Sequence, residues 1–224
     1  MKLEKFVLAI VMVASATVAN AGLLTVDTYD MLNGDVGSYS YWDETYDGSG
    51  DVGVSRSSLT GGTGDLTDGI IASGTWNAVE PGSGLPGAQL GDNGPYVGWV
   101  NYNPFITFNF AQTVNITSAT VYVDNQVNQG GVGGPASVAF DGLSFANYIP
   151  RVNGTTAALS FDFDFTGDSL GVELVRSNSW VFVSEVQFFG DIVEQEDTQV
   201  PVPTTLALLG LGLAGLGWKR RKQA

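Results

Sequence analysis

The sequence predicts an all-β fold, an antiparallel β-sandwich with jelly-roll connections. Apolar and polar residues alternate in several short runs, most clearly at 106–110, 119–123, 161–165 and 180–188. A period of two is typical of strands with one buried face. Clusters of Gly, Asn, Asp, Ser and Pro separate these runs, as expected for turns, at 61–64, 92–95 and 130–135. The region between the two ends shows no 3.6-residue apolar period, which favours a sandwich over a helical fold.

The composition excludes several kinds of chemistry. The 224 residues contain no Cys and no His, which rules out disulfides, thiolate or imidazole metal sites and Ser-His-Asp nucleophiles. The formal net charge is −14, and the central body carries only the three basic residues Arg56, Arg151 and Arg176. Such an acidic body is not expected to bind nucleic acid. The composition still allows the binding of a hard cation such as calcium. It also allows catalysis by paired carboxylates.

Residues 1–21 have the features of a secretory signal peptide. Two lysines within the first five residues precede an apolar run from Phe6 to Ala16, and Ala19 and Ala21 form a small-x-small pattern. We expect signal peptidase to cleave after Ala21. The alternative is an uncleaved anchor, but the apolar run is short for a membrane span. The following body therefore belongs in an exported compartment.

The C-terminal end combines three features. A Pro-x-Pro motif comes first, formed by Val200, Pro201, Val202 and Pro203. An apolar segment follows, in which Gly interrupts a series of large residues, Leu206, Leu209, Leu211, Leu213, Leu216 and Trp218. From Val200 to Trp218 there are 19 residues, close to the roughly 20 that cross a bilayer. A basic tail completes the end with Lys219, Arg220, Arg221 and Lys222, and such clusters stay in the cytoplasm.

This C-terminal arrangement resembles the PEP-CTERM sorting signal of Gram-negative, exopolysaccharide-producing bacteria. It departs from the usual pattern at Val202, where the family has Glu. The resemblance implies that an exosortase recognises the motif and cuts near it. The chain would be anchored transiently in the inner membrane and then reach the cell surface or extracellular matrix. We expect a body at 22–192, an acidic linker at 193–200 and a sorting signal at 201–224.

Four short segments of the body carry a second resemblance. They are Asp65–Gly69, Thr75-Trp76, Pro104–Phe110 and Val183–Gly190. Together they are similar to the galactose-binding-like (discoidin) β-sandwich, over roughly residues 60–191. The resemblance implies a sandwich whose last strand closes beside an Asp-Gly turn near its start. It also makes sugar binding the expected activity.

The same resemblance implies a structural calcium ion between that turn and the last strand. On the matching positions its ligands would be Asp68, Thr75 and Glu185, with Gly69 setting the turn. Carboxylate and neutral oxygens suit calcium, and no softer ligand competes. The alternative is that Asp68 caps a turn and Glu185 lies on a solvent-exposed face.

Three functions follow as hypotheses. The first is a non-catalytic exported surface or matrix protein associated with carbohydrate, most naturally exopolysaccharide. The second is a structural envelope or biofilm protein without a defined ligand. The third is a secreted glycoside hydrolase that uses the carboxylates of Asp162 and Asp164, two residues apart on one strand. We expect those two side chains to be the solvent-facing side of the strand instead.

Overall fold

A computed structural model describes residues 21–80 and 94–194. The chain divides into two units, Met1–Val193 and Glu194–Ala224, and the description below concerns the first. The signal peptide up to residue 20 and the whole sorting signal lie outside the described residues. No helix within the described ranges is long and apolar enough to cross a membrane.

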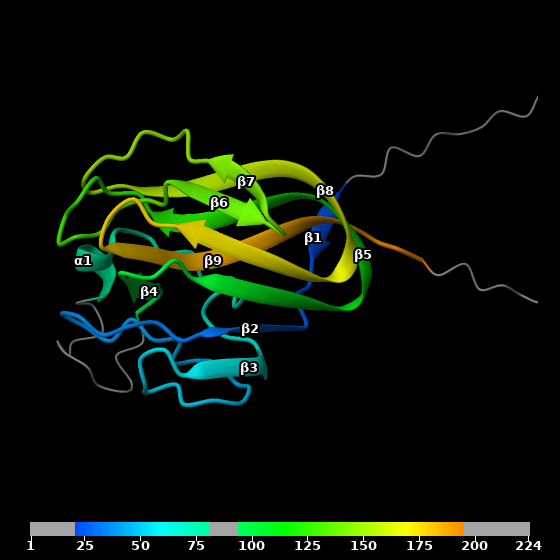
Figure 1. The fold of residues 1–224 in the computed structure, drawn as a ribbon, viewed down its shortest axis with the longest axis horizontal. Helices are drawn as coiled ribbons and strands as arrows, with labels where there is room; N and C mark the ends of the chain where they lie inside the picture. The colour runs from blue at the N-terminus through cyan, green and yellow to red at the C-terminus, as the bar shows by residue number, and fades with distance from the viewer. Residues whose placement is uncertain (1–20, 81–93, 195–224) are drawn as a thin grey trace, which may run out of the picture. The chain divides into compact units, whose positions relative to one another are not determined.

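The described body is built from strands and one single-turn helix. In chain order they are β1 Gly22–Leu24, β2 Thr28–Leu32, β3 Ser58–Gly62, α1 Trp76–Val79, β4 Val97–Val100, β5 Phe105–Asp124, β6 Ser137–Phe140, β7 Leu143–Ala146, β8 Thr156–Val175 and β9 Trp180–Ile192 (Figure 1). All pairings between these strands are antiparallel. The predicted all-β, antiparallel fold class is confirmed.

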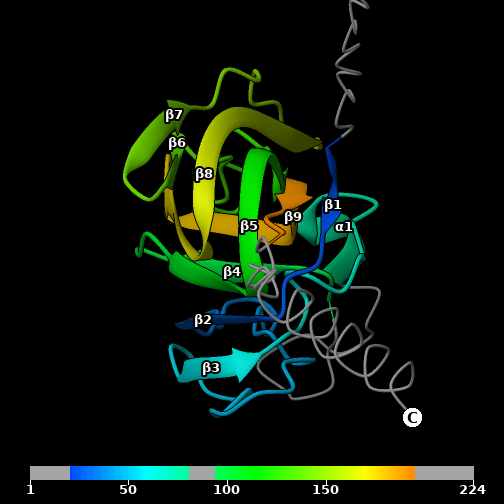
Figure 2. The same ribbon diagram turned by 90° about the vertical axis from the view of Figure 1, so that its right-hand side faces the viewer.

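The strands form one sheet that folds over itself. The main order is β1-β9-β5-β8-β6-β7, and β2 and β4 join at β5 and β9. β5 and β8 pair along almost their whole length, with register shifts between Asn109 and Val114 and between Ile116 and Ser118. Such irregularities bend a strand, and Figure 2 shows that both β5 and β8 are curved. The two halves of β5 therefore contribute to opposite sides of one interior, as β2 pairs with the first half and β9 with the second.

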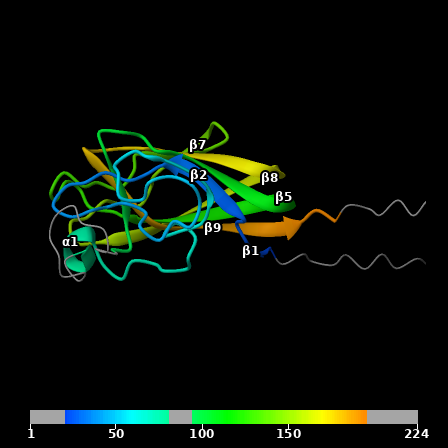
Figure 3. The ribbon, with the colours of Figure 1, turned by 90° about the horizontal axis from the view of Figure 1, so that it is seen from below.

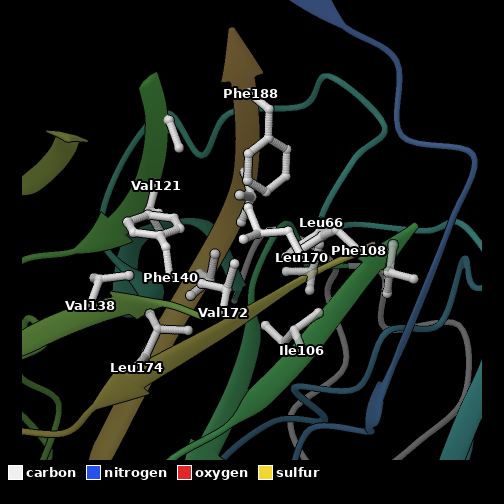
Figure 4. Packing of buried hydrophobic residues seen from close by; sticks show 14 of the residues in the cluster. Leu66, Ile106, Phe108, Val121, Val138, Phe140, Leu170, Val172, Leu174 and Phe188 are labelled. Carbon is white, nitrogen blue, oxygen red and sulfur yellow. The ribbon is translucent and has the colours of Figure 1, made fainter. Parts of the chain in front are cut away.

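The alternating residues predicted to face inward make the core. Figure 4 shows this cluster, which includes Ile106, Phe108, Val121, Leu170, Val172, Leu174 and Phe188. The rings of Phe108 and Phe188 meet edge to face, with centroids 5.0 Å apart. Each such side chain contributes roughly 1.5–3 kcal/mol when fully buried. This core stabilises the strands, and the loops at the rim of the sandwich are anchored at both ends to those strands.

A second, aromatic cluster lies at the α1 end of the sandwich. Its buried members are Tyr41, Ala72, Tyr96, Val132 and Phe182, and Tyr39, Trp76, Val79 and Trp180 pack against them. α1 lies at the opposite end from β1 (Figures 1 and 3). Tyr41, Tyr96 and Phe182 are thus interior packing, whereas Tyr39, Trp76 and Trp180 are partly exposed at the edge of this cluster.

Candidate functional site

The predicted turn and the last strand meet as expected from the resemblance. The loop after β3 runs along the edge of β9, where the Val186 amide donates to the Leu66 carbonyl at 2.8 Å. The Gly69 amide donates to Glu185 Oε2 at 3.2 Å. Gly69 has φ +82°, a conformation that favours glycine. The structure therefore brings Asp68, Gly69 and Glu185 together.

Both carboxylates of this turn are already held by backbone groups. Asp68 Oδ1 accepts a hydrogen bond from the Ile70 amide at 2.7 Å. Burial raises the pKa of Glu185 to about 7, and the nearby Asp68 charge adds to the rise while the Gly69 amide opposes it. Burial also raises the pKa of Asp68. Because burial disfavours the ionised form of both acids, a bound proton or a nearby cation stabilises them in the folded turn.

Thr75, the remaining predicted ligand, is the residue directly before α1. Its hydroxyl donates to Asn77 Oδ1 at 2.9 Å, and its carbonyl accepts from the Ala78 amide at 2.8 Å. The first amide of the helix, that of Trp76, donates to Asp124 Oδ2 at 2.8 Å. No described hydrogen bond joins Thr75 to Asp68 or Glu185. The structure gives Thr75 a place at the helix start.

Two further carboxylates near the turn were not predicted from the sequence. Asp43 is fully buried, and Asp65 is 6% exposed. Asp43 accepts from the Tyr29 hydroxyl and, at 2.9 Å, from the Asp65 amide. Asp65 Oδ1 accepts from the Thr45 hydroxyl at 2.5 Å. Both residues lie in loops, where no periodicity signals burial.

Burial disfavours the ionised form of both acids. It raises the pKa of Asp65 to about 8, with the charge of Asp43 as the second cause. It raises the pKa of Asp43 to about 6, although the hydrogen bonds from Tyr29 and the Asp65 amide act in the opposite direction. The only ion pair among the described residues is Arg56 with Asp35, at 3.0 Å. No described basic side chain therefore neutralises the Asp43 and Asp65 pair.

Asp68 lies at the wall of two pockets. The larger, of about 470 Å³, has a polar side of Thr45, Asp65 and Asp68 and an apolar side of Ile70, Ile71, Ala72, Val79 and Pro95. The smaller, of about 230 Å³, lies between Glu185 and the chain around β1, and Thr67 and Gly69 also line it. The Thr67 hydroxyl oxygen is buried without a hydrogen-bond partner among the described residues. Both pockets therefore place side-chain oxygen atoms, which can bind a cation or form hydrogen bonds, next to apolar walls.

The donor set suits a hard cation, but the acids do not surround one point. Among the described residues, no group of three or more acidic side chains is arranged to hold a metal ion. Asp68 and Glu185 would need turn carbonyls and water to complete the six to eight oxygens that calcium takes. The residues present therefore fit a calcium site completed by turn carbonyls and water better than a site made of side chains alone.

Comparison with known proteins decides the nature of the C-terminal end. The model of the PEP-CTERM protein-sorting motif matches residues 199–222. The chain carries a PEP-CTERM sorting motif. The match includes the Pro-x-Pro residues, the apolar segment and the basic tail, so this prediction is confirmed despite Val202 in place of the usual Glu. A PEP-CTERM motif indicates an exported protein that is sorted at the cell envelope.

Comparisons of the body are less informative. No curated protein matches the sequence. A solved structure of truncated AlyQ with CBM32 and alginate lyase domains gives a TM-score of 0.40 at 10% identity, covering 78% of this chain and 34% of that one. The CBM32 of AlyQ in complex with 4,5-unsaturated mannuronic acid gives 0.36 at 11%, covering 75% and 98%. A Streptococcus pneumoniae fucose binding module gives 0.34 at 14%, covering 66% and 95%. At these TM-scores the similarity supports no argument about function.

Proposed function

We propose that the chain is a non-catalytic surface or extracellular-matrix protein that an exosortase sorts and that associates with exopolysaccharide. The observation that carries the proposal is the PEP-CTERM motif at residues 199–222. It follows a β-rich, acidic body that suits an exported compartment. In this proposal the apolar segment holds the chain in the inner membrane of a Gram-negative bacterium until the tail is removed.

Mass spectrometry of the native protein tests the sorting step. Protein recovered from the cell surface or matrix should begin at Gly22 and lack the residues after about Pro203, because both end segments are expected to be removed. The same gene expressed in a strain without the exosortase should yield chains that retain Lys219 to Ala224. Surface protein with an intact tail would contradict exosortase processing.

The carbohydrate part of the proposal is supported by the aromatic cluster at the α1 end. Tyr39, Trp76 and Trp180 are half-buried there, and their rings combine an apolar face with a polar edge. The flanking loops contribute amides, including Asn178, whose side chain donates to the Val127 carbonyl. A partly exposed aromatic surface among amides is a suitable place for a sugar ring to stack and hydrogen-bond.

A non-catalytic role is also consistent with the geometry of the suspected carboxylate pair. Asp162 and Asp164 are exposed on β8. Their neighbours Phe161 and Phe163 point inward. Asp162 lines a pocket beside β8 that Asp164 does not line, so the pockets of the described residues do not enclose the two acids together as a paired mechanism would require. Release of reducing ends that is abolished by Asp162→Asn or Asp164→Asn would instead favour the hydrolase hypothesis.

Binding to the producing organism's own exopolysaccharide tests the carbohydrate part. The full chain in a non-ionic detergent should bind it saturably, and a Trp180→Leu variant should bind less at a temperature where circular dichroism shows that it is still folded. Absence of saturable binding together with concentration-dependent assembly would favour the structural envelope protein.

Calcium at the Asp68 turn is a separate part of the proposal. Asp68 and Glu185 would hold the ion together with turn carbonyls, and the ion would fasten the loop after β3 to β9. Its chemistry is structural, since oxygen ligands and a filled shell stabilise without reacting.

A further inference from the structure

One edge of β8 has no strand beside it for most of its length. β8 pairs with β5 from Thr156 to Glu173, but on its other side β6 joins it only from Val172 to Val175. Among the described residues, no strand pairs with this second edge from Thr156 to Gly171, a stretch that can be followed in Figure 2. The unpaired N–H and C=O groups of an edge strand are a template for an added strand.

The side chains along this edge form two distinct rows. The inward row is apolar and buried, with Leu159, Phe161 and Phe163. The outward row is polar and exposed, with Ser160, Asp162, Asp164 and Thr166. A strand added here would place its own alternate side chains next to these two rows. The edge therefore suits a segment in which apolar and polar residues alternate.

A pocket of about 290 Å³ opens beside the same edge. It lies between β8 and the chain that follows β7, and its walls include Phe145, Tyr148, Ile149, Leu159 and Phe161. Phe145 packs against Phe161 with ring centroids 5.6 Å apart. Tyr148 is 89% exposed, although it contributes a large ring to the rim. Ser160 and Asp162 of the outward row also line the pocket, which can take one apolar side chain of an added strand.

Charge determines which segment would bind. Asp162, Asp164 and Asp168 are exposed along the edge, and none of them forms an ion pair with a described Lys or Arg. A second copy of the chain, paired antiparallel about Phe163, would set Asp162 opposite Asp164. Like charges in that position are destabilising, and each copy carries a net charge of −14. A basic partner avoids both the contact between like-charged aspartates and the repulsion between two acidic chains.

We propose that this edge of β8 binds an extended, basic segment of another protein by strand addition. Lys or Arg on alternate residues of that segment lie beside Asp162 and Asp164. An apolar residue of the same segment fills the pocket next to Tyr148. The interaction is independent of the exopolysaccharide association and of calcium.

The probe is a fluorescent peptide in which Lys and Val alternate. The reference is a peptide of the same composition whose lysines are contiguous, which has the same charge but cannot present alternate rows. With the full chain in a non-ionic detergent, fluorescence anisotropy should show saturable binding of the alternating peptide and weaker binding of the reference. Amide hydrogen exchange between residues 157 and 170 should slow only with the alternating peptide.

Charge-matched variants separate the edge from general attraction. Asp162→Lys/Asp164→Lys should weaken binding about tenfold, because two attractions become repulsions. Asp27→Lys/Asp191→Lys changes the charge equally at two other exposed acids and should retain most of the affinity. Tyr148→Ser, at an exposed position, should also weaken binding of the alternating peptide. Equal binding of both peptides, equal loss in both double variants, unchanged exchange along β8, or no binding at all would each overturn the proposal.

Discussion

The Tyr29 hydroxyl donates a hydrogen bond to the buried carboxylate of Asp43. Tyr29 belongs to β2, whereas Asp43 lies in the loop between β2 and β3. Asp43 in turn accepts from the Asp65 amide, and its own amide donates to Asn33 Oδ1 at 2.8 Å. The carboxylate of Asp43, which lies in the loop between β2 and β3, therefore connects β2 with the loop after β3 that leads to the Asp68 turn.

Tyr29→Phe should lower the free energy of unfolding at pH 7 by about 1–3 kcal/mol, because a buried carboxylate loses its hydroxyl donor. The loss should be smaller at pH 4.5, where Asp43 is protonated, since burial raises the pKa of Asp43 to about 6. Urea unfolding at both pH values measures this. Tyr148→Phe, at an exposed position, should change nothing at either pH. A loss that does not depend on pH would show that the hydroxyl acts only by packing.

The Asp43 and Asp65 pair should make the protein more stable in mild acid than in mild base. Both pKa values are raised in the folded state, so their contribution is fully present below the usual value of 3.8 and is lost as the pH rises to about 8. We expect a decrease of at least about 1 kcal/mol between pH 5 and pH 8.5 in chelator. Asp65→Asn should reduce that slope, and the raised pKa values of Glu185 and Asp124 should account for part of what remains. An unchanged slope in this variant would assign the pH dependence to other groups.

The pairing of β1 with β9 includes two glycines that differ in their tolerance of a side chain. Gly22 and Gly190 lie opposite each other. A Cβ on Gly190 would lie 1.9 Å from the Asn115 carbonyl oxygen, whereas a Cβ on Gly22 has its nearest neighbour at 3.9 Å. Gly190→Ala should destabilise by about 2 kcal/mol or more, and Gly22→Ala by less than about 0.5 kcal/mol. Thermal unfolding compares them, and equal midpoints would mean that β5 can move away from β9.

The calcium proposal predicts a ligand-dependent effect of Glu185→Gln. The variant should lower the melting temperature when calcium is present and change it little in chelator, because Gln retains an acceptor for the Gly69 amide but lacks the charge. Asp162→Asn, at an exposed acid, is the matched control and should respond to calcium as the unchanged protein does. Equal losses for Glu185→Gln under both conditions would point to hydrogen bonding alone.

Much of the fold could be predicted because period-two alternation reports one-sided burial directly. The runs at 106–110, 119–123 and 161–165 all lie within observed strands. The sequence did not show that the first two belong to a single strand, β5, since the bulges between Asn109 and Ser118 interrupt the alternation without ending the pairing. The length and curvature of β5 and β8 depend on partners distant in the sequence.

The candidate site was predicted less completely. The contact between Gly69 and Glu185 was anticipated from one resemblance, and the PEP-CTERM motif from another, carried by the Pro-x-Pro residues, the apolar segment and the basic tail. Asp43 and Asp65 were not, because a loop aspartate usually caps a turn in water. They become buried only when the two loops close over Tyr29, and no local pattern encodes that closure.

The direction of β9 has a mechanical consequence. β9 begins at Trp180 in the aromatic cluster at the α1 end, where β4 pairs with it, and ends at Ile192 beside β5, with β1 paired just before that end. Its hydrogen bonds lie across the strand axis, as in any antiparallel ladder. A pull that enters at Ile192 and is resisted at the α1 end therefore loads many of these bonds in shear at once, instead of opening them one after another. A body built this way resists forces along that axis better than forces applied across it.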